Sequence, residues 1–174
     1  MISDTMQDAL NDQMNFELFS AYLYLSMSAY FQSLNLPGFA NWMHVQAQEE
    51  MVHVMKFYNF ILGRGGRVLL KTIDGPQTDW SAPIAPFEDA YAHEQKVTAR
   101  INNLINLAID ERDHATNAFL QWFVTEQVEE ESNVDAVVRQ LRLVGEDKSG
   151  LFMIDRELGT RVFVPPATGG QGAA

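Results

Sequence analysis

Four apolar helical stripes run through this sequence, and polar side chains interrupt each of them near its middle. Within each stripe hydrophobic residues recur at steps of three and four, the spacing that places side chains on one face of an α-helix. We therefore expect the interrupting side chains to point inward together with Phe and Ile residues. They are Glu17 in the first stripe, Glu50 and His53 in the second, Glu94 in the third, and Gln127 and Glu130 in the fourth.

Carboxylates at such positions are costly to bury. An unpaired buried carboxylate loses several kcal/mol of hydration, and carboxylates that converge also repel one another. His53 is the one residue on these stripes that could become cationic, and no Lys or Arg lies near the carboxylates on the stripes. Two divalent cations would balance the four carboxylates, with a nitrogen ligand from His53 and a neutral oxygen from Gln127. Because Glu50 and His53 are three residues apart, both can reach the same ion.

The chain as a whole reads as four long helices and a short fifth one. Ser3 and Asp113 are suitable capping residues, and Pro37 and Pro86 suit the first position of a helix. Glycines follow the points where the second and fourth helices are expected to end. The expected helices cover about residues 3–33, 37–62, 86–110, 114–144 and 150–158.

Residues 67–85, between the second and third helices, lack a helical period and are punctuated by prolines. Val68, Leu69 and Leu70 indicate a brief extended piece. At about 3.3 Å per residue an extended stretch of this length can span a bundle, so we expect the third helix to run parallel to the second. A loop that links two domains is the alternative, but two helices alone could not bury these stripes.

These features predict an all-α fold: a four-helix bundle with a long crossover between helices two and three, plus a short fifth helix. We expect one domain over residues 1–164, followed by a flexible tail rich in Pro, Gly and Ala over residues 165–174. Because the polar interruptions lie near the middles of neighbouring helices, they should meet at one level. The sequence therefore predicts one site inside the bundle.

Composition argues against several classes of function. The chain has no cysteine, which excludes disulfides, thiolate metal sites, iron–sulfur clusters and cysteine nucleophiles and fits a reducing cytoplasm. A formal net charge of −11 argues against nucleic acid as a partner and favours cations, although it also serves ordinary solubility. No stretch approaches the ~20 apolar residues of a membrane span, and the first residues do not resemble a secretory signal. We expect a cytoplasmic protein.

The segments around the polar interruptions resemble the non-haem ferritins of bacteria and archaea. The resemblance runs from residue 11 to residue 158 and is carried mainly by residues 48–53, 92–94 and 119–131. It implies a ferritin-like fold and a hollow homo-oligomeric shell, typically of 24 subunits, that oxidises Fe(II) and stores it as a ferric mineral. It further implies a di-iron site in which one iron is held by Glu17, Glu50 and His53, Glu50 bridges, and the second iron belongs to Glu94, Gln127 and Glu130.

The resemblance also suggests roles for residues beside the pair. Glu49, Glu126 and Glu129 match positions that bind a third iron in some of these ferritins, and a solvated helix face is the alternative for them. Tyr24 matches a tyrosine near the iron pair that can donate an electron, and it lies two turns from Glu17 on the same helix face. A simple core tyrosine is the alternative for Tyr24.

Two related groups of proteins fit less well. Bacterioferritins bind haem through a methionine at the position of Met51, but they carry a second Glu-x-x-His on the fourth helix, where this chain has Gln127 and Glu130. We therefore expect no haem and interpret Met51 as a helix-packing residue. Rubrerythrins need a cysteine-bound iron, which this chain cannot provide. His44, His93 and His114 are interpreted as surface or packing residues.

We predict a ferroxidase and iron store that uses dioxygen or peroxide as oxidant. The first alternative is a di-iron enzyme that turns over peroxide or an organic substrate without a mineral store, and the second is a purely structural bundle. Phe19, Tyr30, Phe31 and Trp80 are expected to lie outside the four-helix core. Exposed apolar patches usually mark subunit contacts, so these four residues are expected to support a closed shell.

Overall fold

The computed structural model describes residues 2–165 of the 174-residue chain. Five helices make up this part: α1 (Asp4–Ser33), α2 (Pro37–Gly63), α3 (Ala85–Asp110), α4 (His114–Val144) and α5 (Lys148–Leu158). No residue between 2 and 165 lies in a strand, so the all-α fold predicted from the sequence is confirmed. The tail expected over residues 165–174 lies outside the described residues, apart from Pro165.

Local hydrogen bonds explain where the helices begin. The Ser3 hydroxyl accepts a bond of 3.0 Å from the backbone N–H of Met6 at the start of α1. The Asp113 carboxylate does the same for Thr116 at the start of α4, at 3.1 Å. Helix α5 begins two residues earlier than expected because Asp147 accepts bonds from the first turn of α5 and serves as its N-cap.

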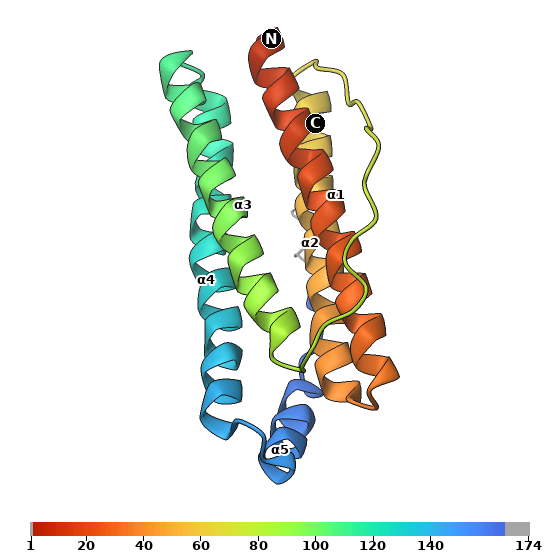
Figure 1. Ribbon diagram of the computed structural model, residues 1–174. Coiled ribbons are helices and arrows are strands. Elements are labelled where there is room, and N and C mark those ends of the chain that lie inside the picture. Colours follow the sequence, from red (N-terminus) through yellow and green to blue (C-terminus); the bar gives the residue numbers. More distant parts are fainter. Residues whose placement is uncertain (1, 166–174) are drawn as a thin grey trace.

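The helices form two antiparallel hairpins, α1 with α2 and α3 with α4, which lie side by side (Figure 1). The crossover runs along α1 from the end of α2 to the start of α3, so α3 is parallel to α2 as the sequence predicts (Figure 1). Helix α5 lies across one end of the bundle. Its Asp155 carboxylate accepts bonds of 2.8 and 3.1 Å from the backbone N–H groups of Gly38 and Phe39, which caps α2.

Side-chain amides on α1 hold the crossover in place. Gln7, Asn11 and Asn15 are spaced one helical turn apart, and each accepts a hydrogen bond of 2.7–2.8 Å from the backbone of residues 67–71. The two asparagines also donate to backbone carbonyls of the same segment, at 2.9 Å. The brief extended piece expected here is therefore satisfied by α1 side chains instead of a partner strand.

The hydrophobic core has two parts along the bundle axis. One part, nearer α5, is built around the fully buried rings of Phe31, Phe39 and Phe87. The other, at the opposite end, is built around Phe57 and Phe123. On every long helix the polar interruption falls between the residues that join the first part and those that join the second. The polar residues therefore share one layer between two apolar ones.

The expected exposed aromatic patch is wrong for Phe31 and only partly right for the others. Phe31 is fully buried in the core, and Phe19, Tyr30 and Trp80 are partly buried against it. Phe31 is buried because its ring packs on Phe39 of α2 and Phe87 of α3, with centroids 5.1 and 5.7 Å away. The crossover covers Tyr30, because Trp80 packs on it with ring centroids 5.1 Å apart and the Trp80 carbonyl accepts the Tyr30 hydroxyl. None of the helices in the part of the chain described here is long and apolar enough to cross a membrane.

Candidate metal centre

All six polar residues that interrupt the stripes lie in the layer between the two parts of the core. Their exposure ranges from 0% for Glu17 and Glu94 to 3% for Glu130. This confirms that they point inward and meet at one level. Whether they can bind a metal depends on the distances between their polar atoms and on the charges they carry.

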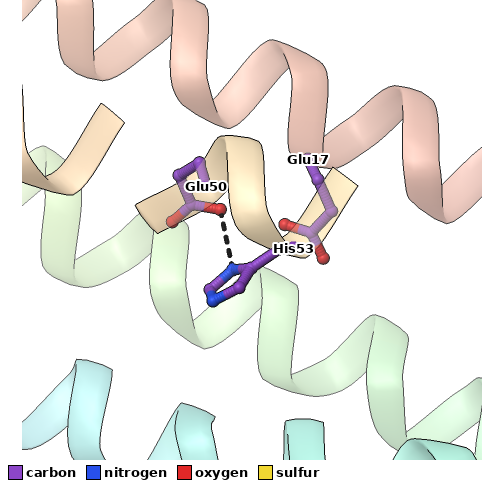
Figure 2. A group of neighbouring side chains, drawn as sticks. All are labelled: Glu17, Glu50 and His53. Carbon is purple, nitrogen blue, oxygen red and sulfur yellow. Dashed lines mark hydrogen bonds and ion pairs between the residues drawn. The ribbon is translucent and has the colours of Figure 1, made fainter. Parts of the chain in front are cut away.

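Glu17, Glu50 and His53 form a tight group. One potential ligand atom from each lies within 4.8 Å of the others, and all three side chains are buried. Figure 2 shows Glu17 approaching from α1 while Glu50 and His53 come from consecutive turns of α2. The His53 Nδ1 atom lies 3.2 Å from Glu50 Oε2. The three-residue spacing therefore does bring the imidazole and the carboxylate to one point.

Glu94, Gln127 and Glu130 face this group from the other hairpin. The Glu94 carboxylate accepts hydrogen bonds from the Tyr24 hydroxyl and, at 3.1 Å, from Gln127 Nε2. Glu130 accepts a bond of 2.6 Å from Gln46 Nε2. Because the Gln127 nitrogen is engaged with Glu94, its amide oxygen is the atom left to face a cation.

The three glutamates matched to a third iron site have different surroundings. Glu126 belongs to a second group with His53 and Glu130, in which the ligand atoms again lie within 4.8 Å of one another. Glu49 is instead paired with the guanidinium of Arg161, from the segment after α5. Glu129 is exposed on α4. The structure therefore places one of the three glutamates directly beside the buried residues.

Burial dominates the electrostatics of this layer. It raises the pKa of Glu50 and of Glu94, and it raises the pKa of Glu130 to about 8. Burial opposes the charged form of His53, but the Glu50 carboxylate, the contact with Glu126 and the Glu17 charge together outweigh it, and the His53 pKa is raised. A protein without metal therefore keeps protons in this layer near neutral pH.

One carboxylate oxygen in this layer has no partner. Among the described residues, Glu17 Oε2 is one of two buried side-chain oxygens that accept no hydrogen bond, and Gln46 Oε1 is the other. Buried oxygens are rarely left unpaired, and a cation held by Glu17, Glu50 and His53 would satisfy Glu17 Oε2. Carboxylate oxygens with one imidazole suit Fe(II), so the donor set fits iron.

The remaining aromatic and histidine side chains can be assigned from their contacts. Tyr24 is fully buried, and burial together with the Glu94 charge raises its pKa, so the phenol stays neutral and donates to Glu94. The His93 ring forms a hydrogen bond of 2.7 Å with the Ser20 hydroxyl and stacks on Phe16. Neither of these contacts involves the six buried polar residues. It is a packing residue, as the sequence indicates. His44 and His114 are exposed, also as expected.

Met51 does not pack inside the bundle. Its side chain is 43% exposed and lines a groove of about 610 Å³ on the α1–α2 face, together with Leu25 and Met55. The helix-packing interpretation of Met51 is therefore wrong. The physical reason is its position, about 100° around α2 from the inward-facing Glu50.

Two glutamines were not recognised in the sequence as part of this site. Gln13 Nε2 donates to Glu17 Oε1 at 2.7 Å, and Gln46 donates to Glu130. Each lies four residues before a site glutamate, Glu17 or Glu50, on the same buried helix face. A polar residue one turn before an inward-facing glutamate was the signal that could have found them.

A family model for the ferritin-like domain matches residues 7–144. This chain belongs to the ferritin family. It is 41% identical over 163 residues to a bacterial non-heme ferritin of Staphylococcus aureus, covering 94% of this chain and 98% of that relative. The family resemblance and the fold predicted from the sequence are therefore confirmed.

Solved ferritin structures agree with this family membership. A ferritin of Archaeoglobus fulgidus, engineered by site-directed mutagenesis into a closed form, has a TM-score of 0.93 at 51% identity and covers 94% of this chain and 100% of its own. An open-pore ferritin from the same hyperthermophilic archaeon has a TM-score of 0.92 at 52% identity, covering 93% and 99%.

Proposed function

We propose that this protein oxidises Fe(II) at the buried carboxylate and histidine layer and stores the ferric product as a mineral. The observation that carries the proposal is the convergence of four buried glutamates and His53 from all four long helices. Membership of the ferritin family supports it, as does the relative described as a non-heme ferritin. A purely structural role does not account for unpaired buried oxygens in this layer.

The residues divide naturally between two iron ions as substrate. Glu17, Glu50 and His53 would hold the first ion, and Glu94, Gln127 and Glu130 the second, with Glu50 shared. The support is the proximity of the first three ligand atoms and the position of the second three on the opposite hairpin. Because the pKa values of the buried glutamates are raised, iron binding must displace protons from this layer.

The electron balance of the reaction is simple. Two Fe(II) ions give one electron each to dioxygen, which leaves as hydrogen peroxide after taking up two protons, and peroxide can itself oxidise two further Fe(II) ions to give water. Protons displaced from Glu50 and Glu130 on iron binding would be available to the reduced oxygen. If a third Fe(II) ion and Tyr24, whose hydroxyl donates to Glu94, each give one more electron, the total of four electrons with four protons reduces dioxygen to two waters.

A third iron site beside Glu126 is part of the proposal. Its support is the second group of ligand atoms, in which Glu126 joins His53 and Glu130. Glu49 would contribute only after release from Arg161, and Glu129 from its exposed position on α4. This site would lead ferric ions away from the buried pair.

We further propose that the domain over residues 1–164 assembles into a homo-oligomeric cage of 24 subunits in the cytoplasm, with no nucleic acid or membrane partner. The engineered and open-pore forms described for the Archaeoglobus fulgidus ferritin are consistent with such an assembly. Apolar side chains on the α1–α2 face, Tyr22, Leu25, Met51 and Met55, are 43–49% exposed in the single chain. They are the best candidates for burial between subunits.

Aerobic loading of the metal-free protein with Fe(II) tests this function. An iron store retains far more iron per subunit than the two or three ions that the proposed sites can hold. Glu50→Ala and His53→Ala should abolish the fast oxidation phase in stopped-flow traces, and Glu146→Ala, which removes an exposed carboxylate beyond the end of α4, is the surface control. Catalytic turnover with only two or three irons retained would favour an enzyme without a store. An unaltered fast phase in Glu50→Ala would remove Glu50 from the site.

A further inference from the structure

A second layer of residues connects the surface of the bundle to Glu17. Gln13, one turn before Glu17 on α1, is 1% exposed and donates from Nε2 to Glu17 Oε1 at 2.7 Å. Its Oε1 atom accepts a bond of 2.8 Å from Arg100 Nε on α3. Arg100 is partly exposed, so the chain of bonds runs from the surface to the buried carboxylate.

Arg100 determines which way the Gln13 amide faces. A guanidinium group donates hydrogen bonds and accepts none, so it selects the amide oxygen. With the oxygen facing Arg100, the NH₂ group must face Glu17. If the amide turned over, its NH₂ would meet the guanidinium and its oxygen would meet the carboxylate, and both contacts would be repulsive.

Arg100 is itself fixed by two further contacts with α1. Its Nη2 atom donates to the backbone carbonyl of Asp12 at 3.1 Å. Its guanidinium carbon lies over the Phe16 ring, 4.3 Å from the centroid, in a cation–π arrangement. Because Asp12, Gln13 and Phe16 belong to one turn of α1, Arg100 is anchored to the segment that carries Glu17.

The two oxygens of Glu17 therefore differ. Oε1 is occupied by Gln13, whereas Oε2 is buried and accepts no hydrogen bond. Oε2 is the atom available to a cation. A chelating carboxylate would use both oxygens and would have to break the bond to Gln13.

We propose that Arg100 is a positioning residue for the first iron: acting through Gln13, it holds Glu17 as a ligand through the single oxygen Oε2. The inference rests on the proposed function, because it assumes that Glu17 binds the metal. One-oxygen binding leaves an additional coordination position on the ion, which water or dioxygen can occupy. It also presents the carboxylate in the binding orientation before the ion arrives.

Zn²⁺ binding to the metal-free protein, measured by calorimetry, tests the proposal without depending on iron oxidation. Arg100→Met keeps the length of the side chain and its packing on Phe16 but removes every donor. We expect the tightest Zn²⁺ step to weaken about 10- to 100-fold, the range typical for loss of a partner that orients a metal ligand. Arg100→Lys, which restores one donor, should recover most of the affinity, and Arg139→Met on the surface of α4 should leave it unchanged.

Gln13→Met keeps the test decisive if Arg100→Met folds poorly. It keeps the length of the side chain but removes the donor that faces Glu17 without adding a charge, so it should weaken Zn²⁺ binding as well. A lower melting temperature with unchanged Zn²⁺ affinity in both variants would mean a merely structural role and would overturn the proposal. So would a crystal structure of the Zn²⁺-loaded wild type in which both oxygens of Glu17 chelate the ion.

Glu17→Ala separates this inference from the proposed function. If Glu17→Ala loses the tight Zn²⁺ step and Arg100→Met keeps it, the positioning role is wrong and the metal site stands. If Glu17→Ala itself keeps the tight step, then Glu17 is not a ligand, and both the assignment of the first iron and the role of Arg100 fail.

Discussion

Replacing Glu130 by Gln should stabilise the metal-free protein, and the effect should grow with pH. Glu130 is 3% exposed, and burial, with the Glu94 charge added, raises its pKa from 4.5 to about 8. Between these values the folded protein holds a proton that the unfolded chain releases. Folding stability is therefore lost as pH rises from about 4.5 to about 8.

The size of the effect follows from the shift. Each pH unit in this window lowers the free energy of unfolding by about 1.4 kcal/mol, so the loss accumulates to roughly 3 kcal/mol at pH 7. The amide introduced by Glu130→Gln would not titrate, and its oxygen can accept the bond that Gln46 now gives to Glu130. For a chain of this length, about 3 kcal/mol corresponds to roughly 6–12 °C in melting temperature.

The assay is the melting temperature in chelator at pH 5, 6, 7 and 8, at one protein concentration. We expect little difference between Glu130→Gln and wild type at pH 5 and the full difference by pH 8. Glu129→Gln, which removes the neighbouring exposed carboxylate, should show no such trend. Saturating Zn²⁺ should reverse the order, because the metal binds the wild-type carboxylate more tightly than the amide and stabilises the folded state accordingly. A difference that does not change with pH, or a variant that melts lower at pH 8, would refute the reasoning.

Three other substitutions test single contacts. Arg161→Gln should free Glu49 from its ion pair and tighten the binding of a third Zn²⁺ ion. The affinity should rise roughly five-fold if the ion pair contributes about 1 kcal/mol. Calorimetry that shows no change would argue against Glu49 as a ligand of the third ion. Tyr24→Phe removes the hydroxyl bonded to Glu94 and should destabilise the metal-free protein by about 1–3 kcal/mol, measured by urea unfolding. Asp155→Ala removes the cap of α2 and should cost about 0.5–2 kcal/mol in the same assay, with Zn²⁺ affinity unchanged.

The parts of this structure that could be predicted are those set by local signals. Ser3 and Asp113 mark helix starts because capping depends on a few neighbouring residues. A polar residue that lies on the apolar stripe of its helix, such as Glu94, has to face the core of the bundle. The pairing of Glu49 with Arg161 could not be predicted, because it depends on where the chain returns after α5. The burial of Phe31 could not be predicted for a similar reason, since it depends on neighbours from other elements.

The structure brings the six residues into one layer, as their spacing indicates, but binding of iron by each of them remains a prediction. The spacing of residues in the sequence is not enough to assign the roles of Gln13 and Gln46. Their positions mark them as inward-facing, yet whether each amide donates to a carboxylate or binds a cation is decided by neighbours on other helices, such as Arg100.

The division of the bundle into two hairpins has a consequence for the order of folding. Contacts within each hairpin are local in sequence, whereas docking of the two hairpins must close the loop formed by the crossover. The first hairpin alone provides Glu17, Glu50 and His53, and the residues proposed for the second ion arrive only with the other hairpin. With the ligands assigned as proposed, a partly folded chain would capture one ion but could not carry out two-electron chemistry. Two ions bound across the junction would slow the separation of the hairpins and so slow unfolding.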